Sequence, residues 1–439
     1  MADGEAGGGG EDPSRELPDE ITGEILLRLP SRSALARAAA ASGAFRALVS
    51  SPRFLRRHRA LHRDLGALLG VFTFSVRPEA PRGEGDGTGF HPAEPPHPAA
   101  AAALALAGAA DFSFGFLPAD DPSAGKWMVR DYRDGRFLLD RVPSGTGSTV
   151  FTELAVCDPL SRCYVLLPPI PQDLADTVES VLTVFGGRRA CEPFLAPAEP
   201  CEGADAEPPL TVFWTARCPR KVVAFAFSSR DGRWRALPSP HCFVWRRQRS
   251  PFSCPIHAVW NRRQYAHGRF YWVDCLMNRW LVLDTRTMEL SLAVIPSPAG
   301  YWEEHVAVVE APDGKVGVFA HGFHHPDGKA DLYYYTIVQD GDDAPRWQLE
   351  KTIPLPWPSA YHRPFCVRGT ANGCLILEVS EEKPAFMASH RIRNADLFKI
   401  DVKSFQIEKI CRARCAGSTA GECCWPYFGF PPSLSLPTV

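Results

Sequence analysis

The chain has 439 residues, of which 45% are hydrophobic and 22% are charged, and its formal net charge at pH 7 is −2. This is an ordinary globular composition, and so small a charge gives no general attraction to nucleic acid or to anionic membranes. The 35 glycines and 41 prolines predict many turns and therefore many short strands. The length predicts two or three domains.

The first residues, 1–13, are rich in glycine and acidic residues and are expected to be disordered. They have neither the basic start nor the apolar stretch of a signal peptide. The most apolar segment, Pro98 to Ala110, is shorter than the roughly 20 residues that cross a bilayer as a helix. We therefore expect no membrane association and a location in the cytoplasm or the nucleus.

Fourteen cysteines without a secretory signal predict reduced thiols. Zinc sites usually draw on paired C-x2-4-C motifs, and the one cysteine cluster has an i, i+4 pair followed by two adjacent residues, which fits poorly. The one histidine cluster lies among glycines and a proline that indicate a loop. We expect no metal and no cofactor from these clusters, which are Cys411, Cys415, Cys423 and Cys424, and His321, His324 and His325.

Residues 17–30 predict an amphipathic helix. Pro18 suits a first helical position, and the acidic residues that follow it complement the helix dipole. Ile21, Ile25 and Leu29 recur at i, i+4 and i+8, which makes one apolar stripe. Pro30 is expected to end the helix.

Two more short helices are expected before residue 66. Ser31 or Ser33 can cap the first of them, and Gly43 marks a break before an apolar run. A third helical stretch begins at Ser51-Pro52. Three helices in about 45 residues bury little surface by themselves, so their apolar faces are expected to need a partner.

The order of these motifs resembles an F-box, most closely the expanded F-box family of plants. The resemblance rests on Leu17 to Pro30, Leu35 to Ala38, Phe45 to Val49 and Ser51 to Phe54. It implies docking to a Skp-family adaptor and, through the adaptor, to a cullin. The docking face implied by the family comprises Leu17, Pro18, Ile21, Ile25, Leu26, Leu29, Pro30, Leu35, Ala38, Phe45 and Leu48.

The composition of this region also fits other roles. Residues 46–63 hold six arginines and no acidic residue, and such clusters can neutralise phosphates. No recognised nucleic-acid reader motif accompanies them, so a solvated helix face is favoured and no nucleic-acid partner is expected. The apolar stripe could also be the core of an internal helix bundle, but the ordered match over three helices favours adaptor docking.

Past about residue 65 the pattern changes to short apolar runs broken by glycine, proline and aspartate. Residues 80–110 are of low complexity and are expected to form a loop or insertion. Downstream, one arrangement recurs: a glycine, an apolar strand, a second strand that ends in an aspartate turn, and a returning strand. Asp158, Asp284 and Asp401 each occupy the first position of such a turn, where the side chain can accept a hydrogen bond from the backbone two residues on.

Five such units, two of them looser, recur every 46–70 residues or so, which is typical of a β-propeller or a similar array. Residues 69–130 are a candidate sixth unit, and the number of blades stays open. The body resembles the F-box-associated, kelch-like β-propeller region of the same plant family.

The predicted fold is therefore α+β and multidomain, with a small three-helix F-box and a large all-β, propeller-like domain. The expected divisions are 1–13 disordered, 14–66 F-box, 67–130 linker or first blade, 131–425 propeller and 426–439 tail. No nucleophile elbow, phosphate-binding glycine loop or paired metal ligands are found. We expect a non-catalytic receptor subunit of an SCF-type (Skp, cullin, F-box) ubiquitin ligase that binds an unknown target protein through residues the sequence does not identify. The alternatives are an adaptor-binding protein that acts outside degradation and a propeller-fold enzyme.

Overall fold

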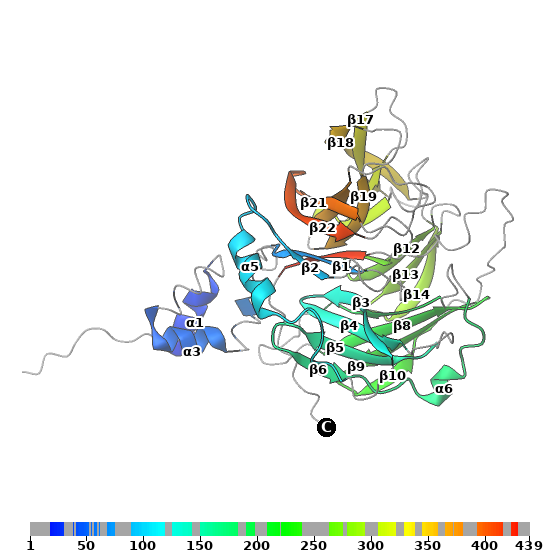
Figure 1. Ribbon diagram of the computed structural model, residues 1–439. Coiled ribbons are helices and arrows are strands. Elements are labelled where there is room, and N and C mark those ends of the chain that lie inside the picture. The colour runs from blue at the N-terminus through cyan, green and yellow to red at the C-terminus, as the bar shows by residue number, and fades with distance from the viewer. Residues whose placement is uncertain are drawn as a thin grey trace, which may run out of the picture. The chain divides into compact units, whose positions relative to one another are not determined.

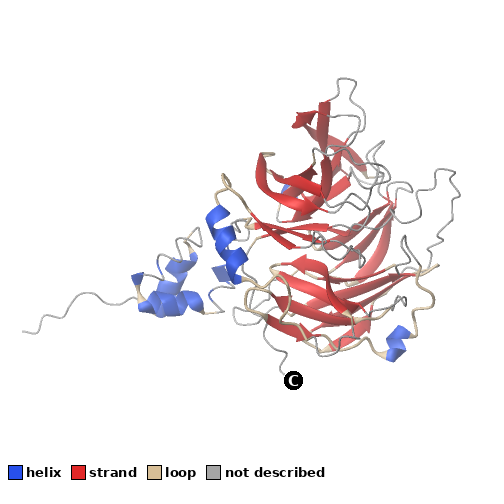
Figure 2. Ribbon diagram, viewed as in Figure 1, coloured by secondary structure: helices blue, strands red, loops and turns tan. Residues whose placement is uncertain are grey.

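The computed structural model divides the chain into two units, which are described separately: residues 1–66 with 200–207, and the remainder. Within the described residues, no helix is long and apolar enough to cross a membrane. Strands dominate the second unit, as Figure 2 shows. The described residues are 18–29, 38, 41–51, 54, 57–58, 61, 68–74, 89–118, 125–142, 150–182, 190–197, 209–219, 221–238, 263–274, 279–294, 306–321, 329–338, 345–358, 365–371, 373–380, 393–415 and 423–428.

The first unit holds the helices α1 (Asp19–Leu27) and α3 (Gly43–Ser50), which contact each other. Two acidic residues occupy the first turn of α1, as the sequence predicted, whereas Pro18, expected at the first helical position, is the N-cap that precedes it. Further helical residues are found at 38, 41, 54, 57, 58 and 61, in the regions of the other two predicted helices. A small apolar core joins these elements, formed by Leu26, Leu27, Val49 and Phe54.

The second unit contains six antiparallel sheets, five of four strands and one of three, among the described residues (Figure 1). In each four-stranded sheet, strands that follow one another in the chain are neighbours. We call these sheets blades 1 to 5. Blade 1 consists of β3 (Lys126–Arg133), β4 (Arg136–Val142), β5 (Glu153–Asp158) and β6 (Cys163–Leu166), and blade 2 consists of β7 (Cys191–Leu195), β8 (Thr211–Arg217), β9 (Val222–Ser228) and β10 (Arg233–Ala236).

Blade 3 consists of β11 (Arg263–Ala266), β12 (Arg269–Asp274), β13 (Arg279–Asp284) and β14 (Glu289–Val294). Blade 4 consists of β15 (Val306–Glu310), β16 (Val316–His321), β17 (Lys329–Val338) and β18 (Arg346–Pro358). Blade 5 consists of β19 (Phe365–Ala371), β20 (Cys374–Val379), β21 (Arg393–Asp401) and β22 (Ile407–Cys415).

Blade 6 is built from both ends of the described body. Its order is β2 (Gly89–Pro92), β1 (Gly70–Phe74) and β23 (Cys423–Tyr427). The remaining elements are two short helices, α6 (Gln172–Ala175) and the 3-10 turn at Pro312–Gly314, and a longer helix, α5 (Ala100–Ala109), which contacts β2.

The sheets form a six-bladed β-propeller. The first strands of neighbouring blades contact one another, β3 with β7, β11 with β15 and β15 with β19, and in blade 6 the last strand, β23, contacts β19. The first strands of blades 1 to 5 and β23 are therefore the inner strands that surround the propeller axis. The all-β propeller predicted from the repeated units is confirmed.

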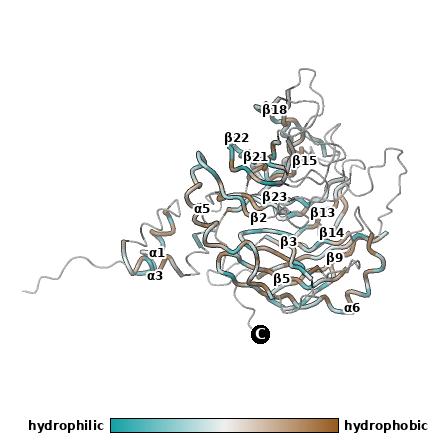
Figure 3. Tube along the Cα trace, in the orientation of Figure 1, coloured by the Kyte–Doolittle hydropathy of each residue, from teal (hydrophilic) through white to brown (hydrophobic). Residues whose placement is uncertain are grey.

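The core lies between neighbouring blades rather than at one centre. Val212 and Trp214 of β8 pack in a cluster with blade 1, whereas Phe213 packs in a cluster with blade 3. Successive side chains of a strand point to opposite faces, and here both faces are covered by another blade. This explains why β9, with the sequence VVAFAFS, is apolar and buried over six consecutive residues. Figure 3 shows such hydrophobic segments in brown among hydrophilic ones in teal.

The aspartate turns predicted from the sequence are confirmed. The backbone amide of Leu160 donates to a carboxylate oxygen of Asp158 over 2.9 Å. The amide of Arg286 donates to Asp284 over 2.9 Å, and the amide of Ser404 donates to Asp401 over 2.7 Å. Each turn joins the third and fourth strands of its blade, so the repeat in the sequence corresponds to the same position in blades 1, 3 and 5.

Three expected boundaries differ from the structure. Residues 80–110, expected as a loop or insertion, contain β2 and α5. The division at residue 131 falls inside β3, and the division at residue 426 falls inside β23. Composition predicted a loop for residues 80–110 because an alanine-rich helix and a proline-containing strand contain the same residue types as a loop.

Blade 6 should make the stability of the body depend on pH. The ring nitrogen Nε2 of His91 lies 2.8 Å from the hydroxyl of Thr73 across the β1–β2 pair, and burial lowers the pKa of His91 to about 4. In the unfolded chain the His91 imidazole is protonated near its ordinary pKa of 6.5. The contribution of neutral His91 to the free energy of unfolding is therefore fully present above pH 6.5 and is lost as the pH falls toward 4. We expect a loss of at most about 1.4 kcal/mol per pH unit in this range.

Urea unfolding of the wild type and of His91→Gln, measured at several pH values between these limits, checks this expectation. The glutamine keeps a partner for Thr73 but does not titrate, so its unfolding free energy should depend less on pH. Equal pH slopes for the two proteins would show that His91 titrates normally in the fold.

Candidate functional site

The clearest exposed apolar feature of the helical unit lies on α1. Ile21 is 49% exposed and Ile25 is 50% exposed. They are four residues apart, so they lie on the same face of the helix, one turn from each other. Two half-exposed isoleucines on one helical face form a small surface suited to covering by another protein.

The other residues of the implied docking face have different surroundings. Pro18 is exposed at the start of α1, whereas Leu26 is only 5% exposed because it belongs to the core of the helical unit. Four more are partly buried against that core, and three lie outside the described residues. The partly buried ones are Leu29, Ala38, Phe45 and Leu48; those outside are Leu17, Pro30 and Leu35.

The face of α1 next to these isoleucines is tied to the third helical stretch. Arg57 forms an ion pair with Glu24, and Nε2 of His58 lies 3.1 Å from the carbonyl oxygen of Leu29. At least one residue of the arginine-rich segment therefore has a carboxylate partner within the chain.

On the body, charged side chains of three inner strands meet near the propeller axis. Nη2 of Arg263 on β11 lies 2.6 Å from Oδ1 of Asp131 on β3, and Nη1 pairs with Glu192 on β7. The guanidinium also lies 4.3 Å from the ring centroid of Phe194. The second oxygen of Asp131 accepts the backbone amide of Leu195 over 2.8 Å. We call Asp131, Glu192 and Arg263 the axial cluster.

The axial cluster could not be predicted from the sequence, because its members are 61 to 132 residues apart and belong to three different blades. The side chains of Asp131 and Arg263 are 2% and 8% exposed, while that of Glu192 is 32% exposed. Removal of one partner from a buried ion pair is strongly destabilising, because it leaves the other charge buried and unpaired. The cluster holds blades 1, 2 and 3 together at their inner strands.

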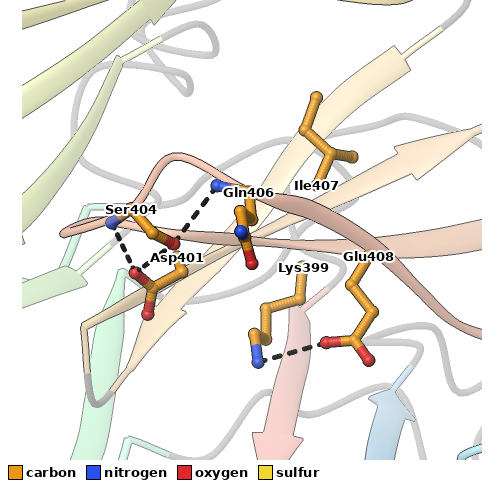
Figure 4. Close-up of a pocket in the computed structure, with 6 residues that line it drawn as sticks. All are labelled: Lys399, Asp401, Ser404, Gln406, Ile407 and Glu408. Atoms are coloured by element: carbon orange, nitrogen blue, oxygen red, sulfur yellow. Dashed lines mark hydrogen bonds and ion pairs between the residues drawn. The ribbon is translucent and has the colours of Figure 1, made fainter.

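A cavity of about 580 Å³ lies on the β21–β22 hairpin of blade 5. Figure 4 shows the dashed contacts between Lys399 and Glu408 and around the turn at Asp401. Lys399 lies 3.4 Å from Glu408, and Nε2 of the buried His97 lies 3.8 Å from the same carboxylate. The pKa of His97 is lowered, because the effect of its burial outweighs the opposing effect of the nearby Glu408 carboxylate. The cavity is lined by Lys399, Asp401, Ser404, Gln406, Ile407 and Glu408.

The two carboxylates that line this cavity are engaged in contacts within the chain. The carboxylate of Asp401 is occupied by the turn, and Glu408 is occupied by Lys399 and His97. Burial raises the pKa of the nearby Cys374 to about 11, so this thiol is protonated and a poor nucleophile at neutral pH. Among the residues that the structure describes, no group of histidine, cysteine, aspartate or glutamate is arranged to hold a metal.

No family model matches the chain, and no curated protein matches it either. Three solved structures share a distant likeness. They are a luciferin-regenerating enzyme (12% identity over 67% of this chain and 81% of that one, TM-score 0.29), the N-terminal domain of Nup159 (11%, 65% and 60%, 0.27) and the NanB sialidase of Streptococcus pneumoniae (10%, 60% and 35%, 0.26). At these identities and TM-scores, the likenesses assign neither a family nor an activity to this chain.

Proposed function

We propose that this protein is the substrate-receptor subunit of an SCF-type ubiquitin ligase. The helical unit docks a Skp-family adaptor, and the propeller recruits a target protein. The observation that carries the proposal is the pair Ile21 and Ile25, half exposed on α1 within the segment that resembles an F-box. A surface of this kind is what an adaptor-binding helix needs.

The energy available from this surface is moderate. Full burial of an isoleucine contributes about 1.5–3 kcal/mol relative to full exposure, and each of these two is already half buried. Covering both therefore contributes on the order of 2 kcal/mol. That is about a thirtyfold change in dissociation constant, since about 1.4 kcal/mol corresponds to tenfold.

The propeller acts in this proposal by proximity. A target held on its surface is kept near the ubiquitin-loaded enzyme that the adaptor and the cullin bring, which raises the effective concentration of the target lysine. No side chain of this chain makes or breaks a bond in that scheme. Its contribution is the geometry with which two binding partners are held.

The test is binding of the full chain to a Skp-family adaptor after co-expression, followed by size-exclusion chromatography and a titration. The double variant Ile21→Ala, Ile25→Ala should bind about thirtyfold more weakly, with unchanged circular dichroism because both side chains are half exposed. Leu349→Ala is the matched control, because Leu349 on β18 is 49% exposed and lies in the body.

Co-elution of the wild type and the Leu349 variant, together with loss of the double variant, supports adaptor docking through α1. Failure of the wild-type chain to bind any Skp-family adaptor tested would overturn the proposal. Adding the cullin to the purified pair then separates a ligase subunit, which joins the larger complex, from an adaptor-binding protein that acts outside degradation.

A further inference from the structure

Arg133 ends the inner strand β3 and reaches toward blade 3. Its guanidinium carbon lies 4.6 Å from the ring centroid of Tyr265 on β11 and 5.1 Å from that of Phe270 on β12. Two residues earlier on β3, Asp131 pairs with Arg263 of the same strand β11. Blades 1 and 3 are thus joined by two successive side-chain contacts, one an ion pair and the other a cation held over aromatic rings.

The two contacts differ in the ion-pair and hydrogen-bond partners of their arginines. Arg263 has two carboxylates, and Arg130, Arg141 and Arg269 each have one. Arg133 forms no ion pair with any part of the chain that the structure describes, and its Nε is buried without a hydrogen-bond partner. An arginine keeps its charge at all physiological pH values and offers five N–H donors in a planar fork.

The rings hold this fork in place. A guanidinium lying over an aromatic face is attracted to it by about 0.5–2 kcal/mol. The hydroxyl oxygen of Tyr265 accepts the amide of Gly268 over 3.1 Å, which leaves the hydroxyl proton as a further donor beside the guanidinium. This arrangement is organised before any ligand arrives.

We propose that Arg133 and the hydroxyl of Tyr265 form a carboxylate-binding site, at the end of the propeller axis where the inner strand β3 ends. The site takes an acidic side chain or a C-terminal carboxylate of the recruited protein. The inference rests on the proposed function in one respect, that the body binds a target protein. A carboxylate matches the fork of a guanidinium with two parallel hydrogen bonds.

The surrounding charges favour a carboxylate over a phosphate. Burial raises the pKa of Tyr265, Arg133 lowers it, and Glu310 and Asp134 raise it, so these charged groups all lie near the ring. Two neighbouring carboxylates repel a doubly charged phosphate more than a singly charged carboxylate. The same charges disfavour a nucleic-acid backbone at this position.

The experiment follows the labelling of Arg133 by phenylglyoxal in the full chain, read by peptide mass spectrometry. The probes are N-acetyl-aspartate N-methylamide for a side-chain carboxylate, N-acetylglycine for a C-terminal carboxylate, inorganic phosphate, and N-acetyl-asparagine N-methylamide as the neutral match. Arg28, whose side chain is 74% exposed, serves as the internal control.

We expect one or both carboxylates to slow the labelling of Arg133 saturably while Arg28 and the neutral probe show no change. The variant Tyr265→Phe keeps the ring but loses the hydroxyl donor, so half-saturation should need about tenfold more carboxylate. Protection by one carboxylate alone identifies the source of the group. Because no adaptor is present, the outcome is independent of adaptor docking.

Two results would overturn the assignment. In one, Arg133 is labelled at the same rate with and without saturating carboxylate, or is not labelled at all. In the other, phosphate protects it more strongly than either carboxylate, which would make the site a phosphate site.

Discussion

A chain that ends after residue 422, and therefore lacks β23, is expected to lose the cooperative unfolding of its body. In blade 6, β1 pairs with β23 from Gly70 opposite Tyr427 to Phe74 opposite Cys423. Tyr427 is fully buried, and Trp425 stacks on Phe72 at 6.5 Å between centroids. Removing the strand deletes both aromatic side chains and leaves β1 without its inner partner.

The size of the effect follows from ordinary core energies. Losing a large buried aromatic side chain costs about 3–5 kcal/mol, and the whole stability of a domain is only about 5–15 kcal/mol. Urea unfolding followed by tryptophan fluorescence, together with near-ultraviolet circular dichroism, measures the loss. The control ends after Phe428 and keeps every described strand, so it should unfold as the full chain does. Equal midpoints for the two truncated chains would show that blade 6 does not close the propeller.

The substitution Arg263→Met is expected to destabilise the body by about 3–5 kcal/mol, because it leaves a buried carboxylate unpaired. Asp131 bears most of this cost, since its side chain is 2% exposed. Glu192 contributes less, because its side chain is 32% exposed and water can solvate it. The free energy of unfolding in urea is the quantity to compare.

Two further variants separate the buried charge from the size of the side chain. Arg269→Met breaks the pair with Asp284, in which the arginine side chain is 53% exposed, and should cost less than about 1 kcal/mol. Arg263→Met combined with Asp131→Leu removes the unpaired charge and should recover part of the loss. An Arg263→Met protein as stable as Arg269→Met would show that the axial cluster adds nothing to stability.

What the sequence could predict depended on how far apart the interacting residues lie. The turns at Asp158, Asp284 and Asp401 were predictable, because the carboxylate accepts amides only two or three residues on. The axial cluster was not, because Asp131 and Arg263 are brought together only when blades 1 and 3 take their places around the axis. A contact of that kind leaves no periodic trace in one chain.

The two ends of the body show the same limit. Residues 423–427 form the inner strand of a blade whose other strands lie near residues 70–92, and no local pattern indicates that pairing. The helical unit was more accessible to prediction, since the spacing of Ile21 and Ile25 placed both on one helical face. Their half exposure, in contrast to the burial of Leu26 one position later, became evident only in the fold.

The pairing of β1 with β23 also has a consequence for the order of events during synthesis. The partners Gly70 and Tyr427 leave the ribosome more than three hundred residues apart, so blades 1 to 5 can emerge before the ring is able to close. Contacts of such long separation form slowly. The helices α1 and α3 emerge before the body, so the helical unit can form while the body is still an open chain of blades. Closure of the ring comes last.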